Sequence, residues 1–522
     1  MQRVARPKVS PLARKGGLKA GESRFGMLLL LPAVAAFCLV VLKPFIEALL
    51  LSFQRFTIEM SEPRWIGLSN YRRVLSDDLL LGSFVTTAIF VAATTFLSIF
   101  IGFCWAILLN QPFRGRDALR GLSLLPWVMP AVVASFLWGW IFNSRYGLVN
   151  AAAFELGLID FPVAWLSTAT GAMAAVVITK VWLSVPLFMS FFLAGLASMD
   201  REQLEAARVD GAGNFRIIKD HILPHLRPVL LVTVVLGMIG NLQHFDTIWA
   251  LTQGGPVRAT SVLSVEVYRR AFEQWDLGMA ATLGVLWLFT IMPPAYFYLR
   301  QLMKGPSDAG SVHALAKLVF ASMLIVIGLF LFFPIYWLVV SSLKSSAELY
   351  LVTPTLWPRD ITLENYRTAI FEGDLGLHLY NSLVVSLSSA TLNATLAVYA
   401  GYSFAKYRYF GRKPVMMFML AAQMFPFGLL LITIYPQLTN WGLLDTRLGL
   451  MVSYIVFALP VATYMLYSYF SQVPNELIEA RAPTAPAICG SFTPSCCRFR
   501  WRRSSPCSST VSCGAGMTCS IP

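Results

Sequence analysis

The chain has 522 residues, of which 57% are hydrophobic and 13% charged, whereas about 25% of the residues in soluble domains are charged. Too few polar residues remain to cover a surface in water, so part of the surface must face lipid. This excludes a cytosolic enzyme, a secreted disulfide scaffold and a disordered chain. The net charge of +14 indicates basic cytoplasmic loops rather than nucleic-acid binding, because the basic residues are scattered between apolar runs.

Apolar stretches of about 20 residues, long enough to cross about 30 Å of hydrocarbon, recur along the chain. Six lie in the first part, at 27–53, 84–109, 122–142, 171–197, 228–252 and 279–302. Four lie in the second part, at 316–343, 379–404, 414–435 and 448–470. The segment 27–42 is similar to a signal peptide, but it continues apolar to Phe53, so we expect a retained helix. The predicted fold is an all-α, polytopic helical membrane protein with about 10 transmembrane helices.

Basic residues set the predicted orientation. The segment before the first span has seven of them and one acid. The loops after the second and fourth spans, and after the second span of the second part, are also basic. Because basic loops stay on the cytoplasmic side, we expect a cytoplasmic N-terminus.

Two short patterns recur in the same order in both parts. Asn-Tyr-Arg follows the first span at 70–72 and again at 365–367. A proline also lies 19 residues before a glutamate in each part (Pro186 and Glu205, Pro460 and Glu479). Six spans precede the second copy, so both copies start on the same side of the membrane. This pattern indicates parallel repeats rather than inverted ones. The first copy has six spans, and the second has four and is therefore incomplete.

The segment after the fourth span, 199–227, carries the most informative motif. Residues 204–212 read LEAARVDGA, in which Glu and Ala favour helix and Gly211 can take the left-handed conformation that ends one. Apolar residues spaced three and four apart predict a second short helix over 212–222, closed by Pro224. These features alone are equally typical of an ordinary pair of interfacial helices.

The same segment resembles the EAA motif of the permease subunits of binding-protein-dependent ABC importers. The matching residues are Glu205, Ala206, Ala207, Gly211, Leu223 and Pro224, while His221 stands where the motif has Ile. The resemblance implies that this EAA loop docks into a cleft of a cytoplasmic ABC ATPase dimer, with Glu205 and Asp210 meeting basic groups. It also implies a multi-pass protein of the plasma (bacterial inner) membrane that moves solute inward by alternating access, supplied by an extracytoplasmic solute-binding protein.

A second resemblance narrows the expected class of solute. The stretch 245–256 (FDTIWALTQGGP) is similar to the carbohydrate-uptake branch of these permeases, the maltose and glycerol-phosphate type, through Phe245, Asp246, Gly254, Gly255 and Pro256. The second part is similar to that branch's partner subunit at 341–349, 363–367 and 477–480. The chain therefore resembles two sugar permease subunits fused end to end. The resemblance implies that the solute is a sugar or a related polyol. Its expected domains are 1–302, a cytoplasmic linker at 303–315, and 316–480.

The second EAA motif starts at Glu479 and Ala480 and then breaks off. The motif continues Ala-Arg, but the chain reads Arg481-Ala482-Pro483, followed by a run with six of the eight cysteines. Restoring one lost nucleotide in codon 480 permits the expected Asp-Gly-Ala and, later, Leu-Pro at the required spacing. Our hypothesis is that 481–522 is an out-of-frame tail, which makes an intact second permease subunit a candidate partner. The alternative is a genuine cysteine-rich cytoplasmic extension, and resequencing near codon 480 separates the two.

Other polar residues in the spans are candidates for the solute path. Lys180 lies within the fourth span, where a charge needs a protein or water partner, so it either lines the path or pairs within the bundle. His244 and Asp246 lie near the outer mouth, where a structural role is the alternative. We find no metal-ligand spacing, no catalytic constellation and no G-x-x-x-x-G-K-[ST]. We therefore expect a permease and not an enzyme, without a cofactor of its own and with ATP bound by a partner chain.

Overall fold

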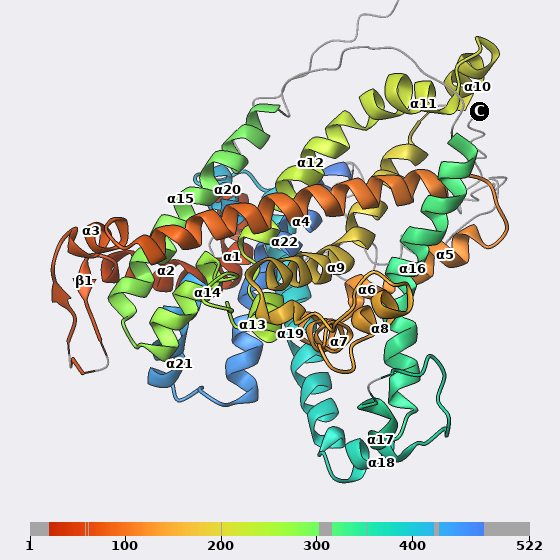
Figure 1. Ribbon diagram of the computed structural model, residues 1–522. Helices are drawn as coiled ribbons and strands as arrows, with labels where there is room; N and C mark the ends of the chain where they lie inside the picture. Colours follow the sequence, from red (N-terminus) through yellow and green to blue (C-terminus); the bar gives the residue numbers. More distant parts are fainter. Residues whose placement is uncertain are drawn as a thin grey trace, which may run out of the picture.

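The computed structural model describes residues 20–57, 59–60, 62–199, 201–301, 316–351, 353–421 and 427–473 (Figure 1). The linker at 303–315, Glu479, Ala480 and the tail at 481–522 lie outside these residues. Helices make up nearly all the regular structure described. One short antiparallel pair of strands, β1 and β2, joins Gln54 to Trp65 and Arg55 to Arg64. The predicted all-α class is confirmed.

The first half of the chain comprises α1 (Ala20–Phe37), η1 (Cys38–Leu42), α2 (Lys43–Leu51), β1 (Gln54–Arg55), β2 (Arg64–Trp65), α3 (Ser69–Leu75), α4 (Asp78–Asn110), α5 (Arg116–Leu122), α6 (Leu125–Val128), α7 (Ala131–Ile141), α8 (Leu148–Glu155), η2 (Trp165–Ser167), α9 (Ala169–Ala197), α10 (Arg201–Val209), α11 (Asn214–Ile217), η3 (Ile218–Ile222), α12 (Leu223–Leu242), α13 (Asp246–Thr252), α14 (Leu263–Tyr268), η4 (Arg269–Glu273) and α15 (Leu277–Gln301). The second half comprises α16 (Ala316–Ser342), α17 (Ser346–Leu349), α18 (Glu364–Phe371), α19 (Leu375–Lys406), α20 (Arg412–Ala421), α21 (Phe427–Asn440) and α22 (Arg447–Gln472).

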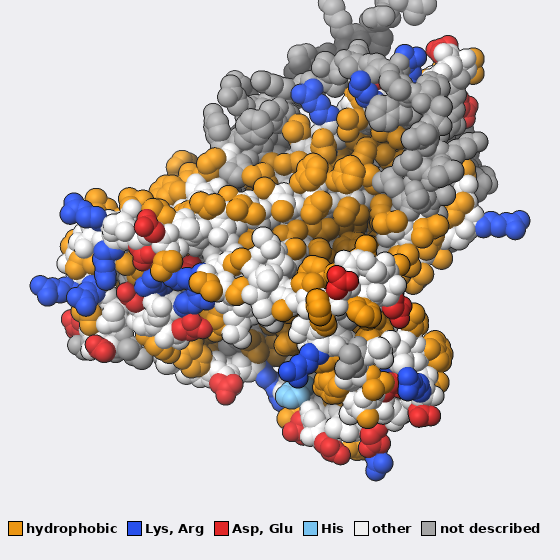
Figure 2. All heavy atoms as spheres, in the orientation of Figure 1, with side chains coloured by type: hydrophobic (Ala, Val, Ile, Leu, Met, Phe, Trp, Pro, Cys, Tyr) orange, Lys and Arg blue, Asp and Glu red, His pale blue; other side chains and the backbone are white. Residues whose placement is uncertain are grey.

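The described residues contain six helices long and apolar enough to cross a membrane, or up to eight if each bent pair is one span. Large hydrophobic side chains such as Phe96 and Phe100 are exposed on them. Figure 2 shows hydrophobic side chains across the middle of one face and charged ones toward its edges. This distribution is the one expected of a surface that faces lipid.

Two predicted spans are interrupted. The span expected at 122–142 is bent by 95° between Val128 and Ala131, next to Pro130. The span expected at 228–252 is wrong as a single helix, because α12 ends at Leu242 and α13 starts at Asp246. Polar residues interrupt the apolar run at 241–246 (NLQHFD). The Asn241 amide donates to Thr95 on α4, and the His244 N–H donates to the Asn241 carbonyl.

The first span of each half packs against the other half. In one direction, Leu30 and Phe37 share a buried cluster with Phe404 and Leu459 of α19 and α22. The Ser403 hydroxyl donates to the Gly26 carbonyl at 2.5 Å. These contacts join the first span of the first half to the helices of the second half.

In the other direction, α16 packs against α4 and α7. The Trp182 indole on α9 donates to the Leu331 carbonyl on α16 at 3.1 Å. Leu331 and Trp337 belong to the buried cluster that fills the first half. Each half therefore needs the first helix of the other to close its core.

In the first half, the Asn-Tyr-Arg repeat forms a latch on the end of the first span. The Asn70 amide donates to the carbonyls of Ser52 (3.3 Å) and Gln54 (2.9 Å). The Tyr71 hydroxyl lies 2.7 Å from the Ser52 hydroxyl. We call these contacts the NYR latch; they satisfy carbonyls that the helix end leaves without partners.

The second half forms the same latch. The Asn365 amide donates to the carbonyls of Ser342 (3.0 Å) and Lys344 (2.7 Å). The Tyr366 hydroxyl lies 2.7 Å from the Ser342 hydroxyl. The recurrence of three hydrogen bonds at one place in each half supports the predicted duplication.

Further local features match between the halves. Gly115 and Gly411, with φ of +86° and +84°, precede the helices that follow α4 and α19. Thr168 and Thr446 cap α9 and α22, each accepting from the backbone N–H three residues on, at 3.2 and 3.1 Å. Equivalent segments of the two halves thus begin and end their helices by the same chemistry.

Candidate functional site

The EAA loop folds as two helices around a bend. α10 ends in a left-handed residue, Gly211, at φ +81°. The Ala212 N–H then donates to the Ala207 carbonyl at 2.8 Å, and Asp210 N–H to Ala206 at 3.0 Å. This is the helix ending that Gly favours because it has no Cβ to clash. The helix and the bend agree with the prediction from sequence.

The second helix of the loop runs straight into a span. α11, η3 and α12 follow one another without a break, and the residues that join them, Ile217 and Ile222, have right-handed helical angles. The prediction that Pro224 closes the helix is therefore wrong. The wider turn of η3 directly precedes Pro224 and shifts the hydrogen-bond register there, so the helix accommodates a residue without an N–H.

The loop has a buried side and an exposed side. Ala207, Ile217 and Ile222 join the core of the first half. Glu205, Ala206, Val209, Asp210 and Gly211 are exposed, Val209 to 87%. The exposed residues lie at the end of the bundle, away from α3 and α13 (Figure 1). An acidic and apolar surface is thus held on a rigid base.

Contacts between α9 and α12 fix the position of the loop. The Ser198 hydroxyl lies 3.1 Å from His225 Nε2. A Cβ at Gly195 would lie 2.5 Å from Leu226 and 3.0 Å from Val229, so the two helices cross in close contact here. Movement of the loop must therefore move the adjoining ends of α9 and α12.

The predicted solute-path residues come together at the opposite end of α12. His244 and Asp246 lie in the turn after this helix, and Lys180 on α9 interacts electrostatically with both. The His244 ring stacks on Phe90, with ring centroids 6.2 Å apart. Its Nε2 is buried and has no hydrogen-bond partner among the residues that the structure describes, while Asp246 is exposed.

Aromatic rings continue from this turn to the second half. Phe245 stacks on Trp249 (5.6 Å), and Trp249 lies 4.6 Å from Tyr268. Tyr268 lies 5.3 Å from Phe272, and Phe272 lies 6.1 Å from Tyr435 on α21. The row places flat apolar faces next to the charged residues of the turn.

The glycines of the FDTIWALTQGGP stretch are explained by crowding. Gly254 has φ of +82°, and a Cβ there would lie 2.9 Å from Val265 and 3.1 Å from Arg269 Nη2. Gly255 and Pro256 form a cis peptide bond. These residues shape the loop between α13 and α14.

A buried ion cluster, which our sequence analysis missed, holds this loop. The Glu266 carboxylate is fully buried and accepts from Arg258 (2.5 Å), Arg269 (2.6 Å) and Ser261 (2.6 Å). The signal was an acid inside the apolar run VLSVEVY with two arginines directly after it. Such an acid needs a cation when the run is buried.

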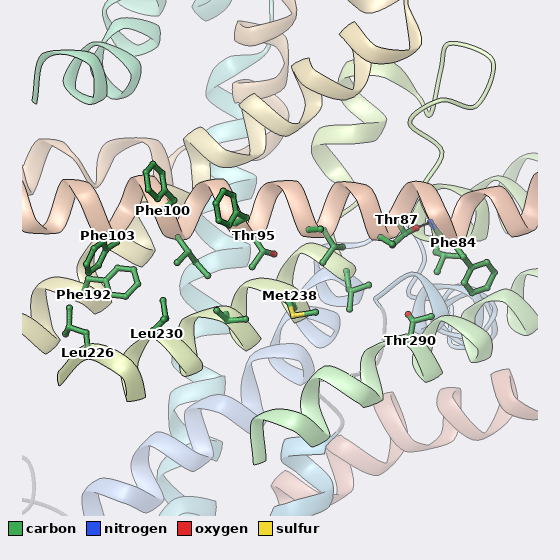
Figure 3. Close-up of a pocket in the computed structure, with 18 of the residues that line it drawn as sticks. Phe84, Thr87, Thr95, Phe100, Phe103, Phe192, Leu226, Leu230, Met238 and Thr290 are labelled. Carbon is green, nitrogen blue, oxygen red and sulfur yellow. Dashed lines mark hydrogen bonds between the residues drawn. The ribbon is translucent and has the colours of Figure 1, made fainter. Parts of the chain in front are cut away.

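A cavity of about 840 Å³ lies between α4 and α12 (Figure 3). Its lining is apolar apart from Thr87, Thr95 and Thr290, and it contains neither Lys180 nor Asp246. A sugar carries many hydroxyl groups that need hydrogen-bond partners. The cavity is therefore a poor candidate for the solute path. Within the part of the chain that the structure describes, no three His, Cys, Asp or Glu residues are grouped to hold a metal.

Comparisons with known proteins bear on residues 98–339, which match the family described as "Binding-protein-dependent transport system inner membrane component". The trehalose/maltose transport system permease protein MalF of Thermococcus litoralis is 33% identical over 283 residues, covering 54% of this chain and 95% of that protein. The diacetylchitobiose uptake system permease protein DasB of Streptomyces coelicolor is 32% identical, covering 56% of this chain and 92% of that protein.

Two further similarities concern a curated protein and a solved structure. The sulfoquinovosyl glycerol transport system permease protein SmoG of Agrobacterium fabrum is 30% identical, covering 54% of this chain and 92% of that protein. The crystal structure of a bacterial ABC transporter involved in the import of alginate contains a chain that is 20% identical. It superposes with a TM-score of 0.47, covering 53% of this chain and 96% of that chain.

Proposed function

We propose, from the premise that this chain belongs to the family of binding-protein-dependent transport system inner membrane components, that ATPase subunits bind it at the EAA loop, 199–227. The chain is a multi-pass membrane permease of an ABC importer and not itself an enzyme. The observation that carries the proposal is the exposure of Glu205, Ala206, Val209 and Asp210 on a loop whose other side is buried in the core.

The mechanism follows from the continuity of η3 and α12. A helix resists bending, so a push on the EAA loop displaces α12 as a rod about 30 Å long, at 1.5 Å per residue. The rod ends two residues before His244 and next to Asp246. Closure of the ATPase subunits would therefore change the distance between this turn and Lys180 on α9. That change is our proposal for how nucleotide controls access to the solute path.

The orientation proposed from the basic loops places the EAA loop and the N-terminus in the cytoplasm. α10 and α11 then face the ATPase, and the NYR latches, α13 and α14 face outward. An extracytoplasmic binding protein would deliver solute to the outward end. The exposed charge of Asp246 lies on that side.

The solute class that we propose is a sugar or related polyol. The named solutes of the relatives are trehalose and maltose, diacetylchitobiose and sulfoquinovosyl glycerol. The turn at Lys180, His244 and Asp246 offers polar partners for hydroxyl groups, and the adjacent aromatic row offers faces for sugar rings. Aromatic stacking combined with a few polar groups is typical of such sites.

We propose further that the chain holds two permease halves, 1–302 and 316–480, joined by the linker. The relatives cover little more than half of this chain, which leaves room for a second permease. The matched NYR latches and helix caps support this division. The second EAA loop would start at Glu479 and Ala480 and continue in the restored reading frame.

A glycine substitution tests the function. Gly211→Asp forces a side chain into a left-handed backbone at the exposed bend and adds a charge to the docking surface. We expect the variant to insert normally in the membrane but to lose co-purified ATPase activity and solute uptake. Gly67→Asp is the matched control, since Gly67 has φ of +60°, an open environment and a place at the opposite end.

Two outcomes would contradict the proposal. One is a well-expressed Gly211→Asp chain that retains uptake and bound ATPase. The other is an equal loss in Gly67→Asp, because that result would trace the defect to backbone strain rather than to the docking surface.

A further inference from the structure

The helices α4 and α19 occupy equivalent places in the two halves. The segment 102–106 of α4 (GFCWA) corresponds to 401–405 of α19 (GYSFA). Each glycine faces the backbone of the next long helix: a Cβ at Gly102 would lie 3.2 Å from the Val185 carbonyl of α9, and one at Gly401 would lie 3.1 Å from the Thr463 carbonyl of α22. With this alignment, Thr87 corresponds to Ser386.

In the first half, the polar stripe of α4 is covered. Ser83, Thr87 and Thr94 are all buried. The Thr87 hydroxyl accepts from the Leu263 N–H at the start of α14, at 2.9 Å. About two turns further along, α12 also contributes, as Asn241 donates to Thr95 of α4 at 2.9 Å. The cover is thus supplied by the last third of the first half.

In the second half, the corresponding stripe of α19 is open. Ser382 and Ser386, which match Ser83 and Thr87, are exposed. Asn393 and Asn381 are partly buried, and the side-chain carbonyl of each has no hydrogen-bond partner in the described part of the chain. We call these four residues the α19 face.

A hollow of about 610 Å³ adjoins this face. It is lined by Asn381, Ser382 and Ser386 of α19 and by Leu443, Thr446 and Tyr454 at and before the start of α22. In the first half, α13 packs against α7 and α9, and α14 packs against α4, at the corresponding place. The hollow therefore has the position that α13 and α14 fill in the first half.

The free-energy cost of leaving this face without a protein neighbour differs between serine and asparagine. A serine hydroxyl can bond back to its own helix, as Ser386 does to the Ser382 carbonyl. An asparagine amide has more donors and acceptors than its own helix can satisfy, and in a membrane span it favours contact with another helix. Asn381 and Asn393 thus indicate a protein surface rather than a lipid surface.

We propose that the α19 face and its hollow are the docking surface for the in-frame continuation of the second half beyond Ala480. This continuation is the counterpart of α12 to α15, in which two long helices are joined through the short helices α13, α14 and η4. The inference rests on the proposed division of the chain into two permease halves. The covering of α4 in the first half identifies this occupant, because the same alignment assigns the same neighbours.

Disulfide cross-linking tests the contact in the full chain with its reading frame restored at codon 480 and its own cysteines replaced. One cysteine replaces Ser386, and another replaces the residue of the continuation that corresponds to Leu263. A protease site inserted before Glu479 then separates the two after oxidation. We expect the fragments to stay joined with Ser386→Cys and to separate with Ser388→Cys, an exposed serine on the opposite side of α19.

The first half supplies a positive control, Thr87→Cys with Leu263→Cys and a protease site between α8 and η2. Fragments that separate with Ser386→Cys while this control stays joined would overturn the proposal. Cross-linking monitors packing and not transport, so it can succeed or fail independently of ATPase binding at the EAA loop.

A substitution in the unrestored chain gives a second test. Asn393→Leu removes an amide without a full set of partners, so we expect an unchanged or higher midpoint of thermal unfolding. Thr94→Leu, at the corresponding buried position of α4, is expected to lower it. A clear fall for Asn393→Leu would show that this chain already satisfies the amide, and the docking surface would be refuted.

Discussion

The two halves share their local devices but differ in what surrounds them. In the first half, α4 crosses α9 at Gly102 and is covered by α12 and α14. In the second half, α19 crosses α22 at Gly401 in the same way, while Ser382 and Ser386 stay exposed. Latches, caps and close crossings need only a few nearby residues. Burial of a whole helix face needs distant segments, so the comparison separates what each half specifies by itself from what it needs supplied.

The largest expected effect compares a buried carboxylate in each half, Glu266 on α14 and Glu348 on α17. Glu266→Ala leaves Arg258 and Arg269 without their buried carboxylate, and we expect a loss of about 3–5 kcal/mol in the free energy of unfolding. Glu348→Ala in the second half should cost less, since its main partners are the Thr355 hydroxyl and the Arg359 N–H. Thermal or denaturant unfolding in detergent measures both losses, and equal losses would contradict the difference in partners.

The NYR latches provide the next comparison. Asn70→Ala removes the amide donor of the Gln54 carbonyl at a site that is 1% exposed, while the Ser52 carbonyl keeps the Thr282 hydroxyl as a donor at 3.0 Å. We expect a loss of about 2 kcal/mol in the free energy of unfolding. Asn365→Ala, which is partly exposed, should cost about half of that because water replaces the amide. Ser76→Ala is the surface control, with an exposed hydrogen bond. A loss at Asn365 greater than at Asn70 would contradict the assigned burial.

At the helix crossings, in contrast, we expect the larger loss of stability in the second half. The nearest atom to an added Cβ is 2.8 Å away at Gly401 and 3.1 Å away at Gly102. We therefore expect both Ala variants to be destabilised by about 1–3 kcal/mol, with Gly401→Ala the worse. Gly240→Ala on α12, where no atom lies within 4 Å, is the control and should be neutral or stabilising. The order of the three unfolding midpoints checks the prediction.

The smallest effect concerns pH. The Thr355 hydroxyl, the Arg359 N–H and nearby Lys344 hold the pKa of Glu348 below its ordinary value. A lowered native pKa means that the stabilisation is complete above about pH 4.3, the ordinary value for Glu, and is lost as the pH falls through the native pKa. Glu348→Gln should flatten the pH dependence of unfolding in that acidic range. An equal pH dependence in the parent chain and in Glu348→Gln would contradict the prediction.

The sequence predicted features that depend on neighbouring residues. The long spans, the bend at Gly211 and the repeat at Asn70 and Asn365 all follow from local apolar runs, glycine and short motifs. Features that depend on distant contacts were missed. The exchange of α1 and α16 between the halves requires the tertiary fold. The pairing of Glu266 with Arg258, eight residues away, depends on how the loop between them turns back.

Errors in the predicted spans have the same physical origin. Average hydropathy joined residues 228–252 into one helix, although the polar residues at 241–246 end α12 at Leu242. The proline rule predicts a helix end at Pro224, but the helix continues through the wider turn of η3 and past Pro224. The solute-path residues were predicted as separate candidates, and only the packing of α9 against α12 and α13 brings Lys180 close to Asp246.

The side of the membrane on which the EAA loop lies tests the central claim most directly. Single cysteines replace Val209, which is 87% exposed on α10, or Phe161, which is 81% exposed in the loop between α8 and η2. Intact cells are then treated with a membrane-impermeant maleimide. We expect labelling at Phe161→Cys in intact cells, and at Val209→Cys only after the membrane is permeabilised. Labelling of Val209→Cys in intact cells would place the loop outside, beyond the reach of any cytoplasmic ATPase, and would contradict the account.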